Sequence, residues 1–133
     1  MSIAISYTEQ QDDNTVYNIV IKNFTSEEIP RTYQGNFNIG QSANGASVMS
    51  GPAYRQKYIW AISAIVSKAD ALSIDAMFRD WDADRAVGES AAVGVADDTW
   101  GATVNSNAVF STPPSFTYLN GSDTLVTFGL TEV

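Results

Sequence analysis

The chain of 133 residues is 44% hydrophobic and 17% charged, a composition that favours one packed domain over disorder. It contains no cysteine and no histidine, which excludes a disulfide framework, thiolate or imidazole metal ligands and a Ser-His-Asp triad. The formal net charge of -8 disfavours nucleic acid as a bound ligand, because contacts to phosphates require a basic patch. No apolar run approaches the ~20 residues that cross a bilayer, and the N-terminus lacks a secretion signal, so we expect no membrane partner.

Two short strands are predicted at the start of the chain. Ile3, Ile5 and Tyr7 alternate with small residues, and residues 16–21 (VYNIVI) form an apolar run after a polar, turn-rich stretch. Such patterns indicate strands, since successive side chains of a strand point to opposite faces. We expect these two strands to form a hairpin. Residues 33–39 alternate more weakly and suggest a further strand.

The middle of the chain is predicted to be a flexible arm or loop at about residues 35–53. It includes the sequence GQSANGASVMSGPA, which is rich in glycine and other small residues. One interpretation is a solvent-exposed loop, and the other is a mobile arm that orders against a neighbouring molecule, since long loops inside compact domains are commonly functional. The candidate assembly contacts of this arm are its apolar side chains, Phe37, Ile39, Val48 and Met49.

The chain is organised around a long strand that passes directly into a helix. Residues 54–66 (YRQKYIWAISAIV) alternate strictly, which is typical of a half-buried strand. Ser67 with Asp70 three residues later is an N-cap pattern, so a helix is predicted over residues 67–82, from Ser67 to Asp82. Apolar residues at helical spacing predict that this helix packs back on the sheet. The candidate core residues of this unit are Tyr58, Trp60, Ile62, Ile74, Phe78 and Trp81.

Further strands are predicted after the helix, at residues 92–95, 100–110, 116–119 and 124–133. Pro113 and Pro114 are expected to end the second of these, because proline cannot donate a hydrogen bond to a strand partner. Asn120 and Gly121 supply the turn of a terminal hairpin. In total, the sequence predicts a mainly β, single domain over residues 1–133: an antiparallel β-sandwich or open barrel of about six or seven strands with one flanking helix.

The acidic cluster around the helix end is the strongest candidate for chemistry. Asp80, Asp82 and Asp84 alternate like the start of a calcium-binding loop, but Arg85 stands where the loop needs glycine and Ala91 where it needs glutamate. A carboxylate-dependent hydrolase built on Asp80 and Asp82 is a further hypothesis, although no cleft or catalytic constellation is indicated. We therefore expect no enzyme activity, metal, cofactor or small-molecule substrate.

The order of these elements resembles the minor tail and distal tail proteins of the tail tip and baseplate of long-tailed bacteriophages. In that family an aromatic-bearing strand precedes a helix with paired aromatic residues, and the chain often finishes on a strand with an acidic residue followed by valine. The matching positions here are Trp60, then Phe78 and Trp81, then Glu132 and Val133.

The resemblance covers roughly residues 54–133 and implies a β-sandwich with one helix that assembles into a six-fold ring, continuing the tail tube toward the baseplate. Tube-forming relatives use a long hairpin or loop that reaches over the next subunit, and residues 35–53 are the segment that fits this role. Larger distal tail proteins carry a second, receptor- or fibre-facing domain for which this chain has no room.

The partners implied by the resemblance are further copies of the chain and other tail or baseplate proteins. DNA would pass through an acidic lumen without being bound. The protein would be made in the host cytoplasm and reside in the virion. The alternative is a small carbohydrate- or surface-binding β-sandwich module, monomeric or dimeric, with Trp100 and Tyr118 as exposed stacking platforms.

Overall fold

A computed structural model describes residues 2–11, 14–25, 31–35, 38–51, 55–89, 91–99, 101–119 and 121–133, with only the backbone described at Val48. These residues form one helix and nine strands. In chain order they are β1 (Ile3–Thr8), β2 (Val16–Ile21), β3 (Arg31–Tyr33), β4 (Asn38–Gln41), β5 (Ser47–Ser50), β6 (Tyr58–Ser67), α1 (Lys68–Ala86), β7 (Val93–Asp97), β8 (Val104–Tyr118) and β9 (Asp123–Glu132).

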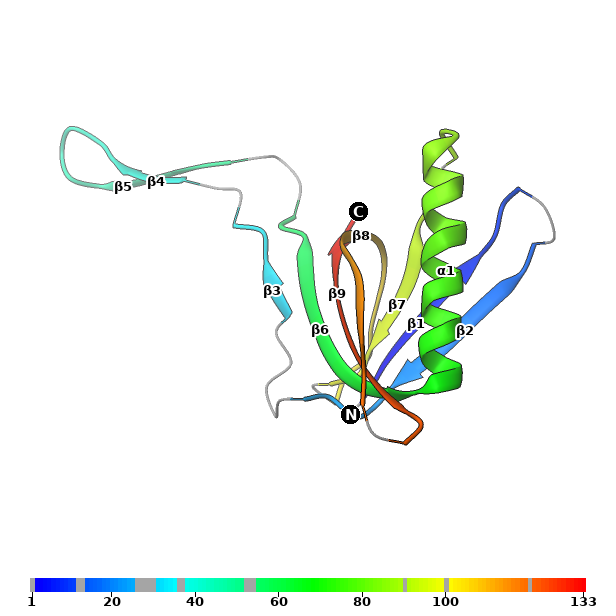
Figure 1. Cartoon of the computed structure of the whole chain (residues 1–133). Coiled ribbons are helices and arrows are strands. Elements are labelled where there is room, and N and C mark those ends of the chain that lie inside the picture. The colour runs from blue at the N-terminus through cyan, green and yellow to red at the C-terminus, as the bar shows by residue number, and fades with distance from the viewer. Residues whose placement is uncertain are drawn as a thin grey trace.

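Seven of the strands form one antiparallel sheet in the order β2-β1-β7-β8-β9-β6-β3. The sheet curves around α1 without closing, with β2 and β3 as its two ends (Figure 1). The remaining two strands, β4 and β5, pair only with each other in the described structure. The predicted mainly β, antiparallel fold with one flanking helix is confirmed in its open form. The sequence predicted about six or seven strands, which matches the main sheet but leaves out the β4–β5 pair.

The junction between β6 and α1 follows the local sequence signals. Ser67 caps the helix, because its Oγ accepts a hydrogen bond of 3.2 Å from the backbone N–H of Asp70. The helix continues to Ala86, four residues beyond the predicted end at Asp82. The additional turn carries Asp84 into the protein interior, where that side chain is fully buried.

The core lies between α1 and the face of the sheet that the helix covers. Trp60, Ile62, Ile74 and Trp81 are buried in it, whereas Tyr58 and Phe78 are partly buried and pack against it. The ring of Phe110 from β8 meets the rings of Phe78 and Trp81 edge-on, each at a centroid distance of 5.1 Å. Such edge-to-face contacts between aromatic rings add to the stabilisation from burial.

The prediction that Pro113 and Pro114 end a strand is wrong. Strand β8 runs through them and pairs with β9 on both sides of the prolines. Two register shifts, between Phe110 and Thr112 and between Thr112 and Ser115, release these positions from the regular ladder. The paired part of β7 ends opposite Ala108, so the prolines need not donate to a second neighbouring strand.

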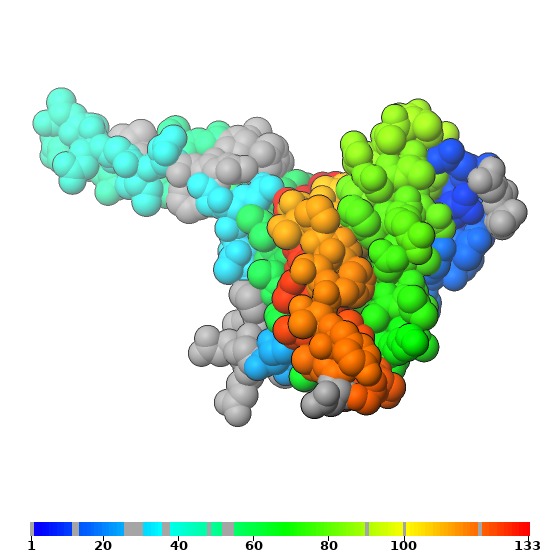
Figure 2. Space-filling view, in the orientation of Figure 1, coloured from blue at the N-terminus to red at the C-terminus, as the bar shows by residue number. Residues whose placement is uncertain are grey.

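Strands β4 and β5 lie in the segment that the sequence predicted as an arm. They form a hairpin that projects from the main sheet at the end where β3 and β6 lie, on the side away from β1 and β2 (Figure 1). Figure 2 shows the same hairpin as a narrow extension of the body. We call the hairpin, residues 38–51, the arm.

Candidate functional site

The arm presents its side chains to solvent. Every described side chain of β4 and β5 is exposed. Ile39 and Met49 are direct cross-strand partners, with 66% and 64% of their surface exposed, so they form one apolar pair at the surface. Of the other predicted assembly residues, Val48 pairs through its backbone with Gly40, and Phe37 lies outside the described residues.

The base of the arm is attached to the edge of the main sheet. Strand β3 pairs with β6, placing Arg31 opposite Trp60 and Tyr33 opposite Tyr58. Just beyond this pairing, the backbone N–H of Gln34 donates a 3.0 Å hydrogen bond to the carbonyl of Lys57. The chain therefore enters and leaves the arm through adjacent, hydrogen-bonded segments.

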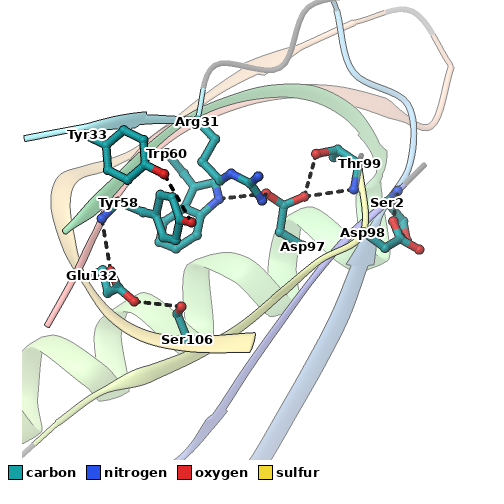
Figure 3. Close-up of polar contacts among 10 residues, drawn as sticks. All are labelled: Ser2, Arg31, Tyr33, Tyr58, Trp60, Asp97, Asp98, Thr99, Ser106 and Glu132. Atoms are coloured by element: carbon teal, nitrogen blue, oxygen red, sulfur yellow. Dashed lines mark hydrogen bonds and ion pairs between the residues drawn. The ribbon is translucent and has the colours of Figure 1, made fainter. Parts of the chain in front are cut away.

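A buried carboxylate, Asp97 of β7, anchors one side of this base (Figure 3). Its Oδ2 accepts hydrogen bonds from Nε1 of Trp60 at 3.0 Å and from the guanidinium of Arg31 at 2.9 Å. Its Oδ1 accepts two more from Thr99, through the backbone N–H at 2.9 Å and the hydroxyl at 2.6 Å. The Arg31–Asp97 ion pair is largely desolvated, with side-chain exposures of 13% and 0%.

A second carboxylate, Glu132 of β9, anchors the other side. Its Oε2 accepts hydrogen bonds of 2.8 Å from the guanidinium of Arg55 and from the hydroxyl of Ser106. Its Oε1 accepts a 3.1 Å hydrogen bond from the backbone N–H of Tyr58, at the first residue of β6 (Figure 3). Glu132 is buried while Arg55 is mostly exposed, so this ion pair is closer to solvent than the one at Asp97.

The ring of Tyr58 joins the two anchors. The guanidinium carbons of Arg31 and Arg55 lie 5.0 Å and 5.2 Å from its centroid, within the range of cation–π attraction. Tyr33 packs on the same ring at a centroid distance of 5.0 Å. Each arginine thus contacts both a carboxylate on the main sheet and an aromatic ring at the arm base.

The protonation equilibria of the two anchoring carboxylates favour their charged forms. Burial opposes ionisation of Asp97, but hydrogen bonds from Thr99 and Trp60 and the charge of Arg31 outweigh it and lower its pKa. Burial likewise opposes ionisation of Glu132, and Arg55 with the Tyr58 backbone N–H outweighs it, so the pKa of Glu132 is also lowered. Both carboxylates are therefore charged hydrogen-bond acceptors at neutral pH.

The three aspartates at the helix end have separate partners. Asp84 is fully buried and accepts hydrogen bonds from the Tyr7 hydroxyl, from the Gln10 backbone N–H at 3.1 Å and from Gln11 Nε2 at 2.7 Å. Asp80 accepts a hydrogen bond from the hydroxyl of Tyr17.

Asp82 has a local partner, because it pairs with Arg85 at 2.6 Å. Within the described ranges, no group of three or more acidic side chains is arranged to hold a metal ion. Asp84 and Asp80 instead attach α1 to β1, to β2 and to the residues that follow β1.

The residues of the carbohydrate-binding alternative are only partly described. Tyr118 is 72% exposed near the turn between β8 and β9, where its hydroxyl donates a 2.9 Å hydrogen bond to the carbonyl of Gly121. Trp100 lies outside the described residues. Trp60 and Trp81 are buried, so neither presents a ring to a ligand.

The carboxylate anchors were not predicted from the sequence, although one signal points toward them. Residues 29–69 contain no aspartate or glutamate but four of the seven basic residues, Arg31, Arg55, Lys57 and Lys68. Any ion pair formed by an arginine of this stretch requires a carboxylate from elsewhere in the chain. The pattern does not identify the carboxylates that pair with these arginines, because Asp97 and Glu132 lie 66 and 77 residues away from their partners in the sequence.

Comparison of the chain with models of known protein families gives no match, and comparison with curated protein sequences gives none either. Across the described residues, no helix has the length and apolar character needed to cross a membrane.

Proposed function

We propose that the chain is a structural virion protein of a long-tailed bacteriophage, a ring-forming component of the tail tip or baseplate that continues the tail tube. The observation that carries the proposal is the arm, a hairpin that projects from the sheet with an exposed Ile39–Met49 pair and a firmly anchored base. The resemblance of residues 54–133 to tail-tip proteins supplies the biological setting.

The physical argument begins with the stability of the arm. A two-stranded hairpin is marginally stable in water on its own, and this one keeps two large apolar side chains at the surface. Its base, in contrast, is joined to the main sheet by two ion pairs and by the β3–β6 pairing. A hairpin whose base is anchored in this way and whose strands are exposed can bury its apolar pair against another molecule.

The exposed edge strand β2 also supports self-association. The end strand β2 is regular over six residues, lacks charge and proline, and exposes Val16 and Val20. Edge strands of monomers are usually protected by charge, proline or bulges, so β2 is suited to be covered in an assembly. Because most homo-oligomers have closed symmetry, a ring of identical subunits is the simplest arrangement that covers both the arm and this edge.

The charge distribution suits a channel for DNA. The net charge of -8 repels a polyanion, and α1 presents Asp75 and Asp82 at least partly to solvent. A wall of this kind lets DNA pass without holding it. The partners of the protein are then its own copies and neighbouring tail or baseplate proteins.

The test is absolute mass by size-exclusion chromatography with light scattering, on the wild-type chain and on the Ile39→Ser/Met49→Ser double variant. The wild type is expected near six times the chain mass of 14.4 kDa, and the variant at lower mass with an unchanged urea midpoint. The control is Leu72→Ser/Val87→Ser, which removes two side chains of similar exposure from the helix and the residue after it. A wild type that stays monomeric at every concentration contradicts the proposal.

A further inference from the structure

The face of the sheet turned away from α1 carries a groove across β2, β1, β7 and β8. Strand registers align its side chains in two rows, Asn18–Ser6–Gly94–Asn107 and Val20–Ala4–Ala96–Asn105. Small residues occupy the middle of both rows, on β1 and β7, and larger side chains occupy the flanking strands. The hollow has a volume of about 500 Å³. We call it the trough.

The smallest residues of the trough, Ala4, Ser6, Gly94 and Ala96, lie on the paired strands β1 and β7, which form its floor. A Cβ atom added at Gly94 would lie only 2.7 Å from Oγ of Ser6, so a larger residue there fits only if the Ser6 side chain turns away. Asn18, Asn105 and Asn107 stand at its sides and are exposed. No hydrogen bond joins these three amides to other side chains in the described parts of the chain, and each amide offers both donors and an acceptor.

The chemistry of the trough excludes some occupants. Among the described residues, its lining contains no charged residue and no aromatic ring, so neither an ionic ligand nor a stacked sugar has a matching partner among them. Amide groups around a floor of small residues instead suit an uncharged polypeptide that brings its own backbone donors and acceptors. The arm is such a segment, because residues 38–51 contain no charged side chain in a chain that carries 22 of them, 7 basic and 15 acidic.

The dimensions of the arm match the trough. Strands β4 and β5 have four residues each, and β1 pairs with β7 over four residues. Paired strands are about 4.8 Å apart in both cases, so two arm strands can lie over the two floor strands. Ile39 and Met49 share one face of the arm, which places their apolar side chains over Ala4 and Ala96.

We infer that the arm of a second copy of this chain lies in the trough, with its Ile39–Met49 face against the floor and its polar groups against the flanking asparagines. The arm leaves the sheet beside β3, whereas the strands of the trough lie toward the β2 end, three to six positions away in the sheet order. The arm projects away from β1 and β2, two of the strands that form the trough of the same copy (Figure 1). Arm-to-trough contacts between copies run head to tail, and such contacts form a ring when the rotation between neighbouring copies closes.

The inference rests on the proposed ring assembly, and disulfide trapping tests the two separately. The chain has no cysteine, so a Met49→Cys chain and an Ala96→Cys chain can be mixed and mildly oxidised without side reactions. A disulfide requires Cα atoms about 4.4–6.8 Å apart. The matched control replaces Ala96→Cys by Ala61→Cys, an exposed alanine of β6 outside the trough. Light scattering of the same samples reports the oligomeric state.

A cross-linked dimer that forms at least tenfold faster with Ala96→Cys than with Ala61→Cys supports docking in the trough. An oligomer whose arm cross-links no faster to Ala96→Cys overturns this inference, assigns the trough to a different occupant and leaves the ring proposal standing. A chain that remains monomeric overturns both.

A second pair of variants tests the same contact without cysteine. Ala96→Trp fills the trough and is expected to lower the mass of the oligomer, whereas Ala61→Trp leaves it at the wild-type mass. Equal assembly of both tryptophan variants contradicts docking in the trough. Far-ultraviolet circular dichroism of each variant verifies that the sheet has formed.

Discussion

The indole Nε1–H of Trp60 donates a hydrogen bond of 3.0 Å to Oδ2 of Asp97, and neither side chain is exposed to solvent. The same oxygen accepts from Arg31, while Oδ1 accepts twice from Thr99. One carboxylate of β7 thus joins side chains from β6 and β3. Every donor has an acceptor, so the cost of burying these polar groups is offset.

Replacing this carboxylate by an amide is expected to destabilise the fold strongly. In Asp97→Asn, the amide NH₂ must face donors in either orientation, because Trp60 and Arg31 approach one oxygen and Thr99 the other. The substitution also removes the negative charge of Asp97 from beside the largely buried Arg31 guanidinium. Breaking a buried ion pair on one side costs about 3–5 kcal/mol. Urea denaturation followed by tryptophan fluorescence measures the loss.

Asp123→Asn is the matched control, because this aspartate is exposed at the start of β9. Surface substitutions of this kind change the free energy of unfolding by less than about 0.5 kcal/mol. If Asp97→Asn were as stable as Asp123→Asn, the hydrogen-bonded centre at Asp97 would contribute nothing to the fold.

Acid is expected to unfold the protein through its buried carboxylates. The pKa values of Asp84, Asp97 and Glu132 are lower in the folded chain than their ordinary values of 3.8, 3.8 and 4.5. Groups of this kind stabilise the fold above their unfolded pKa, and the stabilisation is lost as the pH falls through the folded pKa. The urea midpoint should therefore be constant near neutral pH and fall steeply below about pH 4.

The Asp97→Asn variant separates one of these contributions. The variant no longer has that carboxylate to protonate. Its urea midpoint should therefore fall less than that of the wild type between about pH 5 and about pH 3. An identical dependence in both proteins would show that protonation of Asp97 plays no part in the acid transition.

The parts of the fold that the sequence predicts are those whose signals are local. Period-two alternation identified β6, and the Ser67 cap located the start of α1, because strand faces and helix caps are set by residues within a few positions of one another. The assignment of Trp60 to the core follows from the same alternation.

The remaining features depend on residues that are distant in the chain. Pro113 and Pro114 are local breakers, yet β9 holds β8 in place on both sides of them. Asp97 and Asp98 are adjacent aspartates, and only the first becomes fully buried, because Trp60 and Arg31 come to it from 37 and 66 residues away. For the same reason the sequence indicated an arm but not the anchors at its base.

Two tyrosines are expected to resist ionisation at high pH. A hydrogen bond to Asp80, together with burial, raises the pKa of Tyr17 to about 12. Burial and a hydrogen bond to Asp84 raise the pKa of Tyr7 well above its ordinary value of 10.0. The neutral tyrosines stabilise the fold below pH 10, and this stabilisation is lost as the pH rises through the folded values. Tyrosinate absorbance of the six tyrosines should include a late step for each of Tyr7 and Tyr17.

The neighbouring aspartates of α1 provide the comparison. Asp80→Asn removes the negative charge beside Tyr17 and should move one late step toward pH 10. Asp82→Asn should leave both steps in place, because Asp82 pairs with Arg85 and not with a tyrosine. Circular dichroism in the same samples verifies that the protein is folded while the steps are recorded. A late step that survives Asp80→Asn unchanged would disprove the assignment to Tyr17.

The bulge that carries β8 through its prolines packs closely against a glycine on the neighbouring strand. A Cβ added at Gly129 would lie 3.0 Å from Oγ1 and 3.2 Å from Cβ of Thr112, and 3.1 Å from Oγ of Ser111. Gly129 pairs with Ala61 on its other side and is itself buried, so the backbone has little freedom to move away. Gly129→Ala is therefore expected to destabilise the fold by about 1–3 kcal/mol, the usual cost of overpacking.

Gly94→Ala is the sharpest comparison for this prediction, because both glycines lie in strands and neither has a positive φ. At Gly94 the added methyl group meets the Oγ of Ser6, an exposed side chain that can turn to another rotamer. Alanine also reduces the conformational entropy of the unfolded chain relative to glycine. Gly94→Ala should then change the urea midpoint little while Gly129→Ala lowers it clearly. Equal midpoints would mean that the bulge at Thr112 accommodates the added methyl group as readily as the side chain of Ser6 does.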